Sequence, residues 1–123
     1  MAKTFRDLIV WQKAHMLVLK VYKYTKDFPK EEKYSLIDDM RRAARSVPTN
    51  IVEGYKRKGY KDALKFFNIS EASLEELKYH TLFSFDLDYL DKVKYRKLEE
   101  LEKEVGRLLD KWQKTYHPKK EHL

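Results

Sequence analysis

Apolar side chains recur with the period of an α-helix in four stretches of the chain, and this pattern constrains the fold more than any other feature. Residues three, four and seven apart share one face of an α-helix. In the first stretch that face carries Val10, Trp11, Ala14, Leu17, Val18 and Val21. No stretch alternates apolar and polar residues with the period of two that a half-buried strand shows. The pattern predicts helices over about residues 8–26, 32–58, 61–89 and 95–116.

Few residues interrupt these stretches. The 123 residues include only three Gly and three Pro, too few for an all-β fold with many tight turns or for a disordered linker. Pro29 ends the first helix because the residue before a proline is forced out of the helical region. Pro48 falls inside the second stretch, but the apolar register continues across it, which favours one kinked helix. We therefore predict a single domain over residues 1–123, of the all-α class: an antiparallel up-down four-helix bundle with a frayed tail over residues 118–123.

The positive charge of the chain is concentrated in its N-terminal half. The net charge is +7, and residues 1–62 hold 15 Lys and Arg against 8 Asp and Glu, whereas the remaining residues are balanced. A local excess of this size attracts polyanions, of which nucleic acid is the commonest in a cytosol. The alternative is a solvated basic surface without a partner. The candidate nucleic-acid-binding residues are Arg41, Arg42, Arg45, Lys56, Arg57, Lys58 and Lys61.

Other polar and aromatic residues near this cluster have two interpretations. Ser46, Asn50 and Glu53 can assist phosphate binding, or they can satisfy backbone groups around Pro48, and the second role is favoured. Tyr55 and Tyr60 flank the basic run and can stack on bases. Tyr55 falls on the predicted core side, which favours packing there.

Two of the predicted helices carry more apolar surface than one core requires. Ile9, Met16 and Leu19 point away from the main stripe of the first helix, and Tyr79, Phe83 and Leu87 form a second stripe on the third. Large exposed apolar patches usually mark an interface, so these six residues predict a homo-oligomer. The alternative is a monomer whose long side chains lie along its surface.

No catalytic or metal-binding pattern is found in the sequence. The chain has no Cys, and its four His occur without the spacing of a metal site. Clustered Asp residues are read as solvated helix faces. We therefore predict a protein that is not an enzyme and uses no metal or cofactor, although a site assembled from two subunits stays possible. No apolar run is long enough to cross a membrane, and the first residues lack a signal-peptide pattern. The expected location is the cytoplasm.

Four blocks of the sequence resemble those of one bacterial family. They are FRDLIVWQKA, FPKEEKYSL, RRAARSVPTNIVEG and KFFNISEASLEEL, which occupy residues 5–14, 28–36, 41–54 and 65–77. The chain resembles, over residues 5–112, the four-helix bundle proteins encoded by intervening sequences in 23S ribosomal RNA genes. It is also similar to the accessory variability subunit of diversity-generating retroelements. Asp88 stands where the family has a glycine.

The resemblance implies a ring-like homo-oligomer, typically a pentamer, with RNA as the favoured nucleic acid. It also implies that a reverse transcriptase can be a protein partner. The leading hypothesis is thus a non-catalytic, basic homo-oligomer that binds RNA or DNA through backbone phosphates. The alternative is an interaction scaffold or adaptor, for example for a reverse transcriptase or a ribosome-associated partner.

Overall fold

Four long α-helices account for most of the chain. The computed structural model describes residues 2–121, with side chains for residues 2–115. The helices are α1 (Ile9–Thr25), α2 (Leu36–Lys56), α3 (Tyr60–Asp86) and α4 (Lys92–Glu121), and two 3₁₀ turns, η1 (Phe5–Asp7) and η2 (Lys30–Glu32), precede α1 and α2. Residues 2–121 contain no strand. The all-α, four-helix prediction is confirmed. The helix α4 continues past residue 118, where a tail is predicted to begin, and residues 122–123 lie outside the described part.

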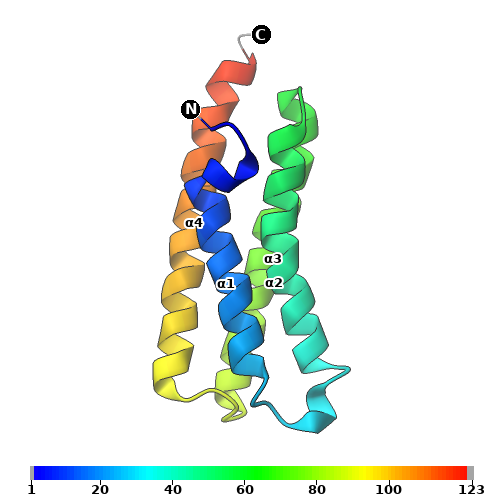
Figure 1. The fold of residues 1–123 in the computed structure, drawn as a ribbon, viewed down its shortest axis with the longest axis vertical. Coiled ribbons are helices and arrows are strands. Elements are labelled where there is room, and N and C mark those ends of the chain that lie inside the picture. The colour runs from blue at the N-terminus through cyan, green and yellow to red at the C-terminus, as the bar shows by residue number, and fades with distance from the viewer. Residues whose placement is uncertain (1, 122–123) are drawn as a thin grey trace.

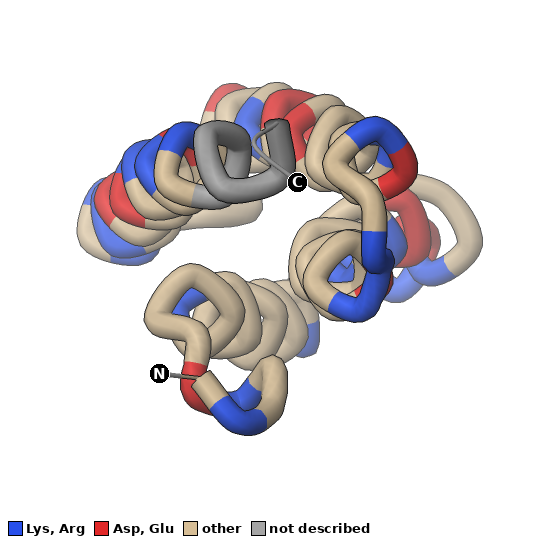
Figure 2. The backbone as a smooth tube through the Cα atoms, turned by 90° about the horizontal axis from the view of Figure 1, so that it is seen from above, with Lys and Arg blue, Asp and Glu red and all other residues tan. Residues whose placement is uncertain are grey.

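The helices lie side by side along the long axis of the molecule (Figure 1). Each contacts two others, in the cyclic order α1, α2, α3, α4 and back to α1. Figure 2 shows this arrangement from above. The helices α1 and α3 therefore occupy opposite corners of the bundle, and a surface on one faces away from a surface on the other. None of the helices in residues 2–121 has the length and apolar character needed to cross a membrane.

The core follows the predicted apolar faces, with one correction on α4. On α2 the residues Met40, Ala44, Val47 and Ile51 are fully buried. On α4 the helical spacing from Leu101 and Val105 predicts Leu108 on the core face. In the structure Leu109 is fully buried, whereas Leu108 is only partly buried and packs against the core. The spacing from Leu98 to Leu109 is eleven residues, close to three full turns of 3.6 residues, which returns the side chain to the same face.

Close packing joins α2 to α3. The helix α2 is continuous through Pro48. The Ser70 hydroxyl on α3 donates a hydrogen bond of 2.9 Å to the carbonyl oxygen of Val47. Near the end of α2, Gly54 lies so close to the ring of Phe67 that a methyl group at this position would overlap it. The absence of a side chain at residue 54 therefore sets how closely the two helices approach.

The connection between α3 and α4 has one residue with unusual backbone geometry. Asp88 has a φ of 63°, in the left-handed region that favours glycine. Its N–H donates to the carbonyl oxygen of Phe85 at 3.0 Å. This conformation gives a physical reason for the glycine that the resemblance implies here, because a glycine adopts it without steric cost.

Candidate nucleic-acid interface

The seven predicted basic residues fall into two groups in space. Arg41, Arg42 and Arg45 lie in the first half of α2, whereas the residues from Lys56 to Lys61 surround the connection between α2 and α3. Fifteen residues of helix separate Arg41 from Lys56, a distance of about 22 Å at 1.5 Å per residue. The two groups therefore cannot contact the same phosphate, although one extended strand can reach both.

Arg41 joins α2 to α1. Its Nε donates to the Thr25 hydroxyl at 2.9 Å, and its guanidinium lies 4.6 Å from the centre of the Tyr22 ring. A second nitrogen donates to the Tyr22 carbonyl oxygen at 3.4 Å. Because these contacts occupy much of the half-buried guanidinium, Arg41 adds positive potential to the surface while its side chain stabilises the α1–α2 contact.

Arg42 and Arg45 are the exposed members of the first group. The Arg42 side chain is 62% exposed and pairs with Asp39, one turn earlier, at 2.6 Å. The guanidinium of Arg45 donates to the Tyr22 hydroxyl. The exposed ion pair between Arg42 and Asp39 contributes little to stability. The guanidinium of Arg42 can therefore leave Asp39 and bind a phosphate at a small cost in free energy.

The second group lies around the start of α3. Lys56, Arg57, Lys58 and Lys61 are all exposed. Arg57 pairs with Glu53 at 3.4 Å and lies 4.4 Å from the centre of the Phe66 ring. Of the two flanking tyrosines, Tyr55 is half-buried and its hydroxyl contacts the carbonyl oxygen of Ala2 at 3.4 Å, which agrees with packing.

The polar residues around Pro48 are engaged within the protein. The Asn50 amide donates to the carbonyl oxygen of Ser46 at 2.8 Å, and the hydroxyl groups of Ser46 and Ser73 lie 2.7 Å apart. Glu53 pairs with Arg57, as described above. The contacts of Ser46 and Asn50 agree with the structural interpretation, whereas Glu53 pairs with an exposed side chain and not with a backbone group.

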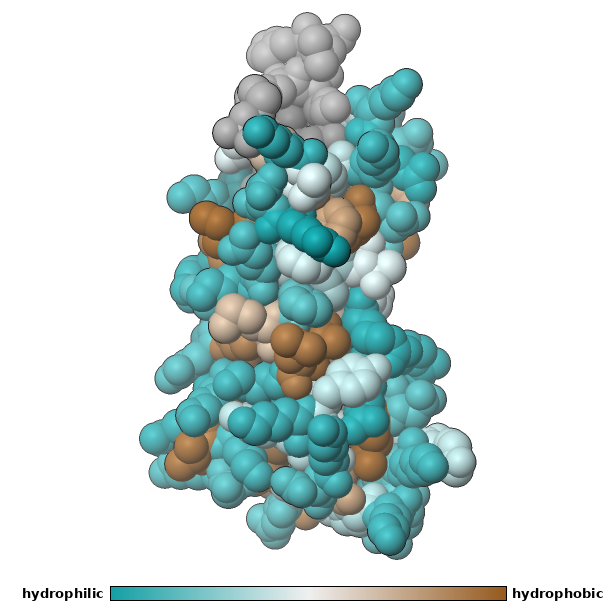
Figure 3. Space-filling model, in the orientation of Figure 1, coloured by the Kyte–Doolittle hydropathy of each residue, from teal (hydrophilic) through white to brown (hydrophobic). Residues whose placement is uncertain are grey.

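The six predicted interface residues are all exposed. Ile9, Met16 and Leu19 lie on the outer side of α1, Tyr79 and Phe83 lie on the outer side of α3, and Leu87 directly follows the last residue of α3. The rings of Tyr79 and Phe83 are parallel within 5°, with centroids 6.0 Å apart. On the face that α1 occupies, hydrophobic side chains gather in patches among hydrophilic ones (Figure 3). Other exposed apolar residues that the sequence analysis did not single out include Ile69, Leu82 and Val93.

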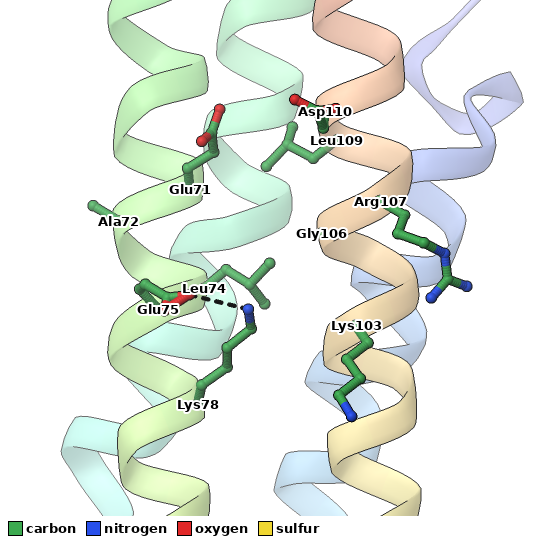
Figure 4. A pocket seen from close by; sticks show the side chains of 10 residues that line it. All are labelled: Glu71, Ala72, Leu74, Glu75, Lys78, Lys103, Gly106, Arg107, Leu109 and Asp110. Carbon is green, nitrogen blue, oxygen red and sulfur yellow. Dashed lines mark hydrogen bonds and ion pairs between the residues drawn. The ribbon is translucent and has the colours of Figure 1, made fainter.

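A groove of about 660 Å³ lies between α3 and α4, and none of the seven predicted basic residues lines it (Figure 4). Its floor includes Leu74, Gly106 and Leu109. The charged side chains around it are three acids and three bases: Glu71, Glu75, Asp110, Lys78, Lys103 and Arg107. The mixed charge gives a polyanion no net attraction to this groove.

Glu102 is a buried acid that the sequence analysis missed. It lies on the core side of α4, 2% exposed, and the Thr81 hydroxyl on α3 donates to its carboxylate at 2.6 Å. Burial raises the pKa of Glu102 to about 7, and the Thr81 hydrogen bond and nearby Lys78 oppose that rise. The spacing of four from Leu98 and three to Val105 is the signal that places it on the core face.

The fold and its surface define a basic four-helix bundle protein. The chain belongs to the 23S rRNA-intervening sequence protein family, whose model matches residues 6–111. A similar solved structure is a protein of unknown function from the S23 ribosomal protein family of Bacteroides thetaiotaomicron. It shares 18% identity, with a TM-score of 0.78 over 86% of this chain and 96% of that chain. A comparison with curated proteins found no match. The family expected from the four sequence blocks is confirmed.

Proposed function

We propose that this chain is a non-catalytic, basic, homo-oligomeric protein of the cytoplasm that binds nucleic acid, with RNA favoured, through backbone phosphates. The observation that carries the proposal is the exposed pair Arg42 and Arg45 on the outer face of α2, followed on the same helix by Lys56. Arginine forms charge-assisted, two-pronged hydrogen bonds with phosphate oxygens. The excess of positive charge in residues 1–62 adds a long-range attraction.

Salt dependence of binding tests the phosphate contacts. We expect fluorescence anisotropy of labelled single- and double-stranded RNA and DNA to show affinity that falls steeply with salt. Each phosphate neutralised adds about 0.7 to the log–log slope for a single strand and about 0.9 for a duplex. The variant R42E/R45E should weaken binding of every sequence and reduce that slope. Arg41 is left unchanged because its contacts hold α1 and α2 together.

A matched control distinguishes binding at the α2 arginines from binding through the net charge of the protein. Lys92 and Arg96 are exposed on α4, four residues apart, and the variant K92E/R96E changes the net charge by the same amount. Equal losses in the two variants would assign the binding to total charge and reject the α2 site. If the wild-type protein binds no nucleic acid at low salt, the function is instead that of the protein-interaction scaffold.

We propose an antiparallel up-down bundle that self-associates into a ring through α1 of one copy and α3 of the next. Two features support this pairing beyond the exposed apolar residues. The helix α1 has no acidic residue and carries Lys13, Lys20 and Lys23. The outer part of α3 carries Glu75, Glu76 and Asp86. Because the two surfaces are different and lie on opposite corners, the contact is head-to-tail, and a head-to-tail contact forms a ring where the rotation between successive copies closes. A pentamer follows from the family resemblance.

Two single variants test the pairing. We expect L19E and F83E each to convert the oligomer to a monomer of 15.0 kDa in light scattering coupled to gel filtration. Each variant keeps one intact surface, so an equimolar mixture should form a heterodimer. A contact between two identical surfaces would leave the mixture no larger than its components, which would refute the head-to-tail arrangement.

A further inference from the structure

A hollow of about 310 Å³ lies between α1 and α2, and Arg45, one of the predicted phosphate-binding residues, lines it. This volume is at the lower end of the range for small-ligand sites. Aromatic rings from the N-terminal part of the chain, Phe5, Trp11 and His15, line one side. Arg45, Pro48 and Thr49 of α2 line the other. The same hollow thus brings together flat rings and a guanidinium from different helices.

The aromatic side of the hollow is held in place by its own contacts. The rings of Trp11 and His15 are parallel within 8° with centroids 4.9 Å apart, and Phe5 meets Trp11 edge-on at 4.9 Å. The turn that carries Phe5 is fixed by the Gln12 side chain, which donates to the carbonyl oxygen of Arg6 at 2.8 Å. A rigid aromatic surface binds a flat ligand with little loss of conformational freedom.

The charged side of the hollow is continuous with the phosphate-binding residues of α2. Arg45 belongs to both: it lines the hollow, and its guanidinium donates to the Tyr22 hydroxyl. Arg42 lies one turn before it, and Lys56 lies about 16 Å further along the helix. A strand that runs along α2 would therefore have cations on both sides of the hollow.

We propose that this hollow receives an unpaired base of a single-stranded nucleic acid, with the base against Trp11 and His15 and an adjoining phosphate on Arg45. The inference rests on the proposed function and adds that the ligand is a single strand. Bases stack readily on aromatic side chains, and every base has a face for such contact. A base in a duplex is already stacked and paired, so it cannot enter. The Thr49 hydroxyl at the rim can contact the edge of the base.

Trp11 fluorescence reports directly on occupancy. The chain has two tryptophans, so the variant W112F leaves Trp11 as the only one. We expect single-stranded oligouridylate to quench this emission and a duplex RNA of equal length to leave it unchanged. Equal quenching by the duplex would overturn the proposal. Uridine monophosphate that quenches as well as the oligonucleotide would also overturn it, by identifying a free nucleotide as the ligand.

Blocking the hollow tests its role in affinity. Thr49 is exposed, and T49F fills the hollow without changing the core. Stacking of one base corresponds to a factor on the order of ten to a hundred in affinity, so single-strand affinity should fall by that factor and much more than duplex affinity. The control is N68F, which places the same ring at an exposed residue of α3 and should leave both affinities unchanged.

The outcomes of this experiment separate the two proposals. If T49F binds single strands as tightly as the wild type does, the hollow is not a base site, while binding through Arg42 and Arg45 still stands. If H15A, which removes an exposed ring, also leaves single-strand affinity unchanged, the aromatic contact is rejected independently. If the wild-type protein binds no nucleic acid, both proposals fail together.

Discussion

The replacement of Glu102 by glutamine should make the protein more stable at neutral and alkaline pH. Glu102 is buried between α3 and α4, where its carboxylate accepts a hydrogen bond from Thr81. Burial raises the pKa of Glu102 from an ordinary value of 4.5 to about 7. Between pH 4.5 and 7, Glu102 is therefore protonated in the native state and ionised in the unfolded state.

The sign and size of the effect follow from proton linkage. Because the native state binds more protons than the unfolded state, the free energy of unfolding falls as pH rises from 4.5 through 7. Each pKa unit corresponds to about 1.4 kcal/mol, so the full loss is about 3 kcal/mol above pH 7. A glutamine carries no charge at any pH in this range and can accept the same hydrogen bond from Thr81. The E102Q variant should escape the loss.

Urea unfolding followed by circular dichroism measures this difference. We expect the wild-type protein and E102Q to converge in stability at low pH and to differ by about 3 kcal/mol, in favour of E102Q, at alkaline pH. Both proteins are compared at one concentration, because oligomers gain stability with concentration. E100Q, at an exposed glutamate of the same helix, should match the wild type throughout to within about 0.5 kcal/mol. A difference between E102Q and the wild type that stays constant with pH would refute the reasoning.

Three further predictions concern packing and backbone geometry. G54A should lower the free energy of unfolding by about 1–3 kcal/mol because its methyl group overlaps Phe67. The control G106A, at which a methyl group would meet its nearest neighbour at an ordinary 3.5 Å, should leave stability unchanged or raise it. Equal effects of the two variants in urea unfolding would reject the overlap. D88G should raise stability by up to about 1 kcal/mol by relieving the positive φ, and an unchanged urea midpoint would show that Asp88 is unstrained. S70A should lower the free energy of unfolding by about 1 kcal/mol because it removes a buried hydrogen bond to α2. Urea unfolding measures this change, and a stability equal to that of the wild type would mean that the bond contributes nothing.

The four-helix architecture could be predicted from the sequence because helical periodicity is a local signal. The apolar rows on α1, α2 and α3 repeat often enough to identify each buried face. Charge asymmetry and the exposed apolar residues could also be found, because both depend only on composition and position along a helix. The family resemblance implied a glycine where Asp88 stands, and the backbone φ of Asp88 gives the physical reason.

Contacts between side chains of different helices could not be predicted from the sequence. Arg41 and Arg45 are one turn apart on the same face of α2, yet Arg41 is half-buried against Thr25 and Tyr22 of α1 whereas Arg45 is exposed. Its role depends on how α1 is rotated against α2, and no pattern within either helix determines that rotation. Glu102 could have been placed on the core face from its spacing, but its partner Thr81 lies on another helix.

The sequence by itself determined the class of the fold, the buried faces of α1, α2 and α3 and the surplus of positive charge, because these follow from the order of side chains along a helix of known period. Only the tertiary structure decided which charged groups are engaged by neighbouring helices and which stay exposed. It also placed Trp11 and His15 beside Arg45, although thirty residues separate the last two in the chain. The physical reason is that side-chain contacts between helices depend on the distance and rotation of the helices, which packing of the whole core sets.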